Sequence, residues 1–159
     1  MKIAEYTIPT LSGERTVLNA DFSKEVAKGI AVLDREKPGW EDRINVPELD
    51  LEDMNQCILG QLFMDQVSGE FGYLVGVSRL SGEYPSGEAG VDWATEHGFY
   101  TDLPHVNVEL DELFNKHVTG SRVDWLYEQL ALEWIAVIQA RRAAKAMVEQ
   151  IVPVDELVH

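Results

Sequence analysis

The chain has 159 residues, of which 45% are hydrophobic and 26% are charged. This length corresponds to about one domain, and the apolar content is too high for a disordered chain. A single cysteine, Cys57, excludes a disulfide-stapled scaffold and fits a reducing compartment. The formal net charge of −15 argues against a protein that grips nucleic acid or an anionic membrane through bulk positive charge.

The first predicted element is a β-hairpin arm within residues 1–20. Its first segment alternates loosely between apolar and polar residues, and Ser12-Gly13 marks the turn. The next element is a helix at about 22–36, in which Val26, Ile30 and Leu33 recur at helical spacing. Lys37-Pro38-Gly39 ends this helix.

A linker with two prolines follows, and its Trp40 and Ile44 are expected to dock on the core. A second helix is predicted at about 51–65, because Asp50 suits a helix start and apolar residues recur from there on. Residues 66–90 are rich in glycine. Within them, residues 71–77 alternate as in a strand, although a short distorted helix fits equally well.

Short helices are predicted at about 88–97 and 108–117, and the longest helix runs from Ser121 to about residue 149. Its core stripe consists of Leu126, Leu130, Trp134 and Ile138, widened by Ala140 and others. A short tail, 151–159, follows. The sequence therefore predicts a mainly α fold in a single domain, 1–159. In it, a helical bundle packs on the long C-terminal helix, with a small N-terminal hairpin and an α+β fold as the alternative.

The sequence holds no recognisable catalytic or metal-binding motif. The four histidines, His97, His105, His117 and His159, are separated by 8, 12 and 42 positions, too far for the short spacing of a zinc site. Cys57 falls mid-helix on an apolar face, as a core residue does. Acids between Glu48 and Asp53 lack the glycine of a calcium loop. We therefore predict no catalytic residue, no metal and no cofactor, and the sequence favours a protein that is not an enzyme.

Acidic residues are concentrated in the middle third of the chain. Residues 61–120 carry ten acids and two bases, whereas the flanking thirds have net charges of −5 and −2. A well-solvated surface explains this excess most simply, and a basic partner or mimicry of a nucleic-acid backbone are the functional alternatives. The basic cluster of Arg141, Arg142 and Lys145 is expected to complement the C-terminal dipole of the long helix.

Tryptophan and tyrosine dominate the binding hot spots of protein interfaces, so aromatic residues near the acidic third are candidates for partner binding. Packing in the core is the competing interpretation. The candidate partner-binding residues are Trp93, Glu96, Phe99, Tyr100, Asp102 and Trp125.

Four segments resemble, in this order, a family of small uncharacterised proteins of actinobacteriophages and actinobacteria. They are LDREKPGWEDRI (33–44), QCILGQLF (56–63), EHGF (96–99) and LYEQLALEWIAVIQARR (126–142). The likeness covers about residues 23–142, and its motifs carry packing and turn chemistry. It implies no activity; it implies a viral protein that acts in the cytoplasm of an actinobacterial host.

The preferred hypothesis is a non-enzymatic, acidic binding protein of the cytoplasm that engages a host or phage protein. No direct contact with nucleic acid is expected. No apolar run approaches the about 20 residues of a membrane span, and the N-terminus lacks the apolar stretch of a signal peptide. The alternatives are a nucleic-acid mimic that inhibits a DNA-binding host or defence protein, a small enzyme that wraps a ligand with residues 69–90, and a homo-oligomeric assembly protein.

Overall fold

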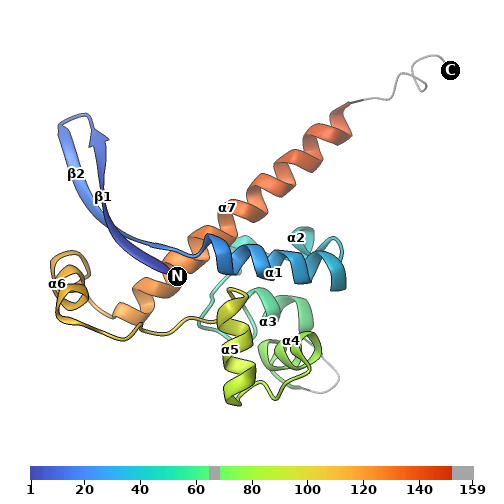
Figure 1. Ribbon diagram of the computed structural model, residues 1–159. Helices are drawn as coiled ribbons and strands as arrows, with labels where there is room; N and C mark the ends of the chain where they lie inside the picture. The colour runs from blue at the N-terminus through green and yellow to red at the C-terminus, as the bar shows by residue number, and fades with distance from the viewer. Residues whose placement is uncertain (65–68, 152–159) are drawn as a thin grey trace.

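The computed structural model describes residues 1–64 and 69–151, and these form a mainly helical body with one projecting hairpin (Figure 1). The hairpin consists of β1 (Lys2–Thr10) and β2 (Gly13–Asp21). The helical elements follow in chain order: α1 (Ser23–Glu36), α2 (Trp40–Arg43), the short 3-10 helix η1 (Val46–Glu48), α3 (Ile58–Phe63), α4 (Gly72–Ser81), α5 (Glu88–Glu96), α6 (Val108–His117) and α7 (Arg122–Gln150). The predicted mainly α fold with an N-terminal hairpin is confirmed.

The hairpin is antiparallel and longer than the sequence pattern indicates. Lys2 pairs with Asp21 at its base and Thr10 with Gly13 at its tip. Two strands alone are marginally stable in water, and the base is held because Leu18 and Ala20 are buried against the helical body. The tip of the hairpin does not pack against the helical body in this way, and Leu11 at the turn is fully exposed.

The core forms around α7, as predicted. Leu126, Leu130, Trp134 and Ile138 are fully buried along one stripe of this helix. The hydroxyl of Ser121 accepts a hydrogen bond from the backbone N–H of Asp124, so the predicted start of the helix is also confirmed. Trp40 docks edge-on against Trp134, with ring centroids 5.8 Å apart, and Ile44 is buried as expected.

The predicted helix at 51–65 is wrong over its first seven residues. The carboxylate of Asp50 accepts a hydrogen bond from the N–H of Glu52, and that of Asp53 accepts one from Asn55, at 3.0 and 2.8 Å. Such local bonds compete with helical hydrogen bonds and fold the segment into turns. A helix begins only at Ile58, and Cys57 is its N-cap residue instead of lying mid-helix.

The part of the glycine-rich segment whose sequence fits both a strand and a helix forms the helix α4. A Cβ atom on Gly72 would lie 2.3 Å from the carbonyl oxygen of Gly60, so these two glycines let α3 and α4 approach closely. Residues 65–68 of the predicted helix and loop, and residues 152–159 of the predicted tail, lie outside the described residues. None of the helices within 1–64 and 69–151 has the length and apolar character needed to cross a membrane.

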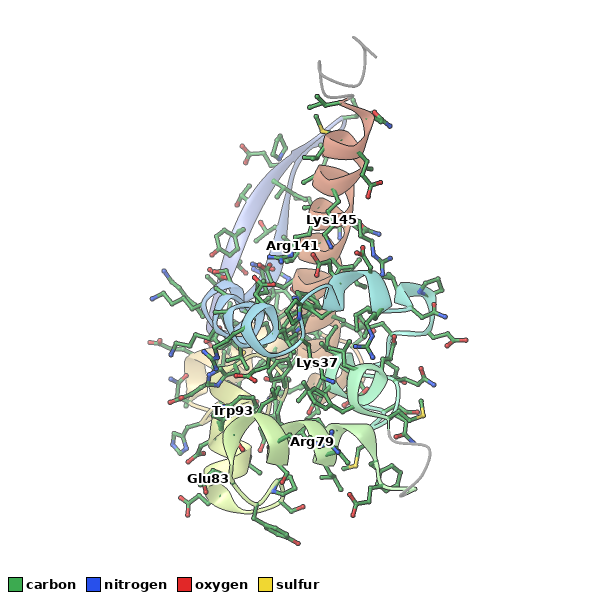
Figure 2. All side chains as sticks on the ribbon, turned by 90° about the vertical axis from the view of Figure 1, so that its right-hand side faces the viewer. Lys37, Arg79, Glu83, Trp93, Arg141 and Lys145 are labelled. Atoms are coloured by element: carbon green, nitrogen blue, oxygen red, sulfur yellow. The ribbon has the colours of Figure 1, made fainter. Side chains whose placement is uncertain are left out.

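The basic cluster of α7 does not serve the helix C-terminus, because α7 continues to Gln150 and the cluster is used for tertiary pairing. Lys145 lies 2.8 Å from the carboxylate of Glu41, and Arg141 lies 2.6 Å from Asp34 (Figure 2). Arg142 donates to the backbone carbonyl oxygen of Glu41. These contacts fasten α1 and α2 to one side of α7.

Replacing Glu41 with glutamine is expected to lower the free energy of unfolding by about 1.5–3 kcal/mol at neutral pH, the range for a hydrogen bond to a charged group. Burial acts to raise the pKa of Glu41, but the hydrogen bond from Lys145 and the charge of Arg141 outweigh it and hold this pKa below its usual value of 4.5. The carboxylate therefore stabilises the fold above pH 4.5 and loses that contribution as the pH falls through its lowered pKa. Urea unfolding of the wild type and of Glu41→Gln, at neutral pH and at pH values below 4.5, measures both the loss of stability and its pH dependence.

The matched control for this experiment is Glu36→Gln. Glu36 pairs only with the exposed Arg35 in the part of the chain that the structure describes. Its replacement is expected to change stability by less than about 0.5 kcal/mol. Equal losses in the two variants would contradict the assigned role of Glu41.

Candidate functional site

Five of the six predicted partner-binding residues lie together, around the C-terminal end of α5 and the segment that follows it. Glu96 and Asp102 are exposed, Trp93 and Tyr100 are half-buried, and Phe99 is buried. The sixth, Trp125, lies on the first turn of α7 and packs edge-on against Phe114 of α6, at 5.7 Å between centroids. It is therefore not part of the same cluster.

The aromatic members of this cluster form a stack that leads into the core. Trp93 stacks on His97 at 4.3 Å and on Phe99 at 5.7 Å, and Phe99 stacks on Trp134 at 5.4 Å. Each ring thus has an aromatic neighbour within its own chain. This geometry indicates that Trp93 and Phe99 contribute mainly to packing.

His97 ends α5, as expected from the sequence, and its Nδ1 lies 2.7 Å from the carbonyl oxygen of Trp93. His117 ends α6 and its Nε2 lies 2.6 Å from the carboxylate of Glu5 on the hairpin. Within residues 1–64 and 69–151, no three histidine, cysteine or acidic side chains are placed to hold a metal ion.

Cys57 is buried, and this desolvation raises the pKa of its thiol to about 11. Its sulfur accepts a hydrogen bond from the backbone N–H of Gly60 at 3.2 Å, capping α3. Because the thiolate is the nucleophilic form, a thiol that stays protonated at neutral pH is suited to packing and capping, and not to nucleophilic chemistry.

Glu96, Tyr100 and Asp102 line one groove of about 540 Å³ between α1, α5 and the segment after α5. Glu25 and Asp92 add two further carboxylates to its wall, and among the residues that the structure describes no lysine, arginine or histidine lines it. The backbone ammonium of Met1 forms an ion pair with Glu25 inside the groove. The groove is thus an acidic surface that suits a basic group.

The glycine-rich segment lines a separate groove of about 640 Å³, between α4 and the turn that precedes α5. Its wall includes Phe71, Arg79 and Tyr84, and none of the acids or histidines near the end of α5.

A second candidate surface, which the sequence did not indicate, lies on the C-terminal half of α7. At about 3.6 residues per turn, one set of apolar residues falls opposite the buried Trp134 and Ile138. We call this set the outer face of α7: Leu132, Ala136, Ala140, Ala143 and Met147. Leu132 is 60% exposed and Met147 is 68% exposed. Ala140, expected in the core from the sequence, is exposed with them.

The outer face reverses the usual pattern of a surface helix, which turns its charged residues to solvent. From Trp134 to Val148 the charged residues are Arg141, Arg142 and Lys145, and all three bind acids or carbonyl oxygens of α1 and α2. The solvent side of this stretch is left without formal charge. It nevertheless stays helical, because alanine, arginine, lysine, methionine and glutamine are strong helix formers.

The hairpin presents a further apolar face. Tyr6 and Ile8 point to one side of β1, and each is more than 40% exposed. On β2, Val17 lies opposite Tyr6, and the one charged residue of this part of the face, Arg15, lies opposite Ile8. Glu5 points to the other side and binds His117 and Lys116 of α6. Apolar residues therefore occupy the hairpin face that does not meet α6.

The hairpin and the outer face lie on the same side of α7. Trp125, which packs against α6, precedes Leu132 by seven residues and so falls on the outer face. Glu5 joins the hairpin to the same α6. Figure 1 accordingly shows α6 and the hairpin on one side of α7 and α1 and α2 on the other. We call the hairpin and residues 139–151 the two projecting arms.

Comparisons with known proteins return no matching family, no matching curated protein and no matching solved structure. The likeness to an actinobacteriophage family therefore stays a prediction. Arguments about function depend on the geometry of this chain alone.

Proposed function

We propose that this protein is a non-enzymatic binding protein that holds another protein between and along its two projecting arms. The observation that carries the proposal is the outer face of α7, an exposed helix face without charge in a chain of net charge −15. Contiguous exposed apolar surface on a soluble protein marks interaction sites, because its burial against a partner is favourable.

The partner that fits this surface is a protein with an apolar patch, and the alanines of the outer face allow its backbone to approach closely. The resemblance noted in the sequence makes this partner a phage protein or a protein of the actinobacterial host cytoplasm. A second copy of the chain is the assembly alternative, and light scattering of the purified protein separates the two.

The acidic groove supports a second role in the same function, because it presents the carboxylates of Asp92, Glu96 and Asp102, whereas Glu25 is paired with the ammonium of Met1. A basic segment of the partner suits this groove. Mimicry of a nucleic-acid backbone requires that the acidic groove supplies most of the binding free energy. In that case high salt releases the partner, because salt screens surface charge.

The variant Ala143→Glu tests the proposal. It places a carboxylate at the centre of the outer face, where the partner would bury it without a counter-charge. We expect at least a tenfold loss of partner binding, which corresponds to about 1.4 kcal/mol. Tagged wild-type and variant proteins are used to capture partners from actinobacterial lysate at low and high salt, and the bound proteins are compared by mass spectrometry.

The matched control is Ala89→Glu, which makes the same change at an exposed helical position of α5, away from both arms. It is expected to retrieve the same proteins as the wild type. The proposal fails if Ala143→Glu also retrieves them unchanged, or if high salt releases every captured protein from the wild type.

A further inference from the structure

A small cavity opens beside the first two turns of α7, where the turn before α3, the helix α4 and the segment after α5 come together. Its volume is about 220 Å³, below the about 300–1,000 Å³ of sites for drug-sized ligands. Half of the lining side chains are aromatic. The lining residues are Leu51, Glu52, Met54, Cys57, Tyr73, Phe99, Tyr100 and Tyr127.

These aromatic residues come from separate parts of the chain. Tyr73 lies on α4, Tyr127 on α7, and Phe99 and Tyr100 on the segment after α5. Tyr100 and Tyr127 meet edge-on with centroids 6.4 Å apart. The fold therefore gathers four rings around one space that no side chain fills.

Glu52 is the one carboxylic acid among these lining residues, and none of them is basic. Burial raises the pKa of Tyr73 and brings that of Tyr127 to about 12, so both hydroxyls stay neutral, as does the Cys57 thiol. A hydrogen bond with Asp124, together with the charges of Asp124, Asp50 and Glu128, raises the pKa of Glu52. In the part of the chain that the structure describes, Glu52 has no ion pair with a basic group.

An aromatic wall with an acidic group and no basic one attracts a cation. The negative face of an aromatic ring interacts favourably with an ammonium group, most strongly where water is excluded. Glu52 is exposed, and a carboxylate close to other carboxylates adds a negative potential that favours a positive ligand. An anion is repelled by this arrangement, and a neutral apolar ligand gains nothing from the charge of Glu52.

We propose that this cavity binds a small organic ammonium ion, of the class of quaternary and alkylated amines. Tyr73, Tyr100 and Tyr127 surround the alkyl groups, Glu52 supplies the counter-charge, and Phe99, which stacks between Trp93 and Trp134, closes the inner wall. This site lies apart from the projecting arms and is independent of the protein partner proposed above.

The test is a calorimetric titration of the full chain with choline and, separately, with its neutral carbon analogue 3,3-dimethylbutan-1-ol. The two probes share a shape and differ in charge. We expect choline to bind at least tenfold more tightly than the neutral analogue. Equal affinities, or no binding of choline, would overturn the proposal.

Three variants test whether the preference for choline over the neutral analogue arises in this cavity. Glu52→Gln is expected to weaken choline binding about tenfold while leaving the neutral analogue unchanged, and Tyr100→Leu is expected to weaken choline more than the analogue. The matched control is Glu96→Gln, which removes one acidic charge from the neighbouring acidic groove; this groove shares Tyr100 with the cavity, but Glu96 does not line the cavity. Equal weakening by Glu52→Gln and Glu96→Gln would mean general attraction to an acidic protein, and the proposal would be rejected. Thermal unfolding checks that each variant is folded.

Discussion

Replacing Trp134 with alanine is expected to lower the free energy of unfolding by about 3–5 kcal/mol, the usual cost of removing a buried tryptophan. Trp134 is fully buried on α7 and connects separate parts of the fold. Its ring meets Trp40 at 5.8 Å and Phe99 at 5.4 Å, so its loss leaves a cavity between α2, α7 and the end of α5. Denaturant unfolding followed by circular dichroism measures the change.

The variant Trp134→Phe separates packing from hydrogen bonding. The indole Nε1 of Trp134 donates a hydrogen bond to the carbonyl oxygen of Gly98 at 2.7 Å, in a buried environment. Phenylalanine keeps most of the ring but leaves this carbonyl unpaired, which costs about 1–3 kcal/mol. As a matched control, Trp125→Ala removes the same side chain from a half-buried position on the same helix. A loss at Trp125 equal to that at Trp134 would contradict the central position assigned to Trp134.

The elements that the sequence predicted well are those with strong helical periodicity and clear boundaries. The periodicity of α1 ends at Pro38, and that of α7 begins at the capping residue Ser121. Prediction failed where side chains compete with the helix, since Asp50 and Asp53 form local turns in what otherwise looks like an apolar helix face. The form of α4 was left open because its glycines serve the close approach to α3, which local alternation does not reveal.

Sequence reasoning also grouped the candidate residues incompletely. It selected Trp93, Phe99 and Tyr100 as aromatic residues near acids, and the structure brings them together because they flank one helix end. It missed the outer face of α7: of the five residues of this face, the sequence pattern assigned only Ala140, and it placed Ala140 in the widened core stripe. Only the pairing of Arg141 and Lys145 with α1 and α2 reveals which side faces solvent.

Replacing Gly29 with alanine is expected to destabilise the protein, although this change in an ordinary helix interior stabilises by about 0.5–1 kcal/mol. Gly29 is buried in α1, and a Cβ atom there would lie 2.2 Å from the carbonyl oxygen of His97 and 3.0 Å from the ring of Trp134. The backbone of α1 and the turn after α5 would have to separate, and overpacking of this kind costs about 1–3 kcal/mol. Urea unfolding of the variant measures this loss.

The matched control lies two residues further along the same helix. Ala31 is exposed, and Ala31→Gly is expected to cost about 0.5–1 kcal/mol through helix propensity alone. If propensity also governed Gly29, the two substitutions would change stability in opposite directions. Because the contact with His97 decides the effect at Gly29, we expect both substitutions to destabilise the protein. A Gly29→Ala variant that is more stable than the wild type would show that α1 does not cross the end of α5 at this contact. This crossing holds Gly98 against Trp134. The segment after α5 starts there, and its residues line both the acidic groove and the small cavity beside α7.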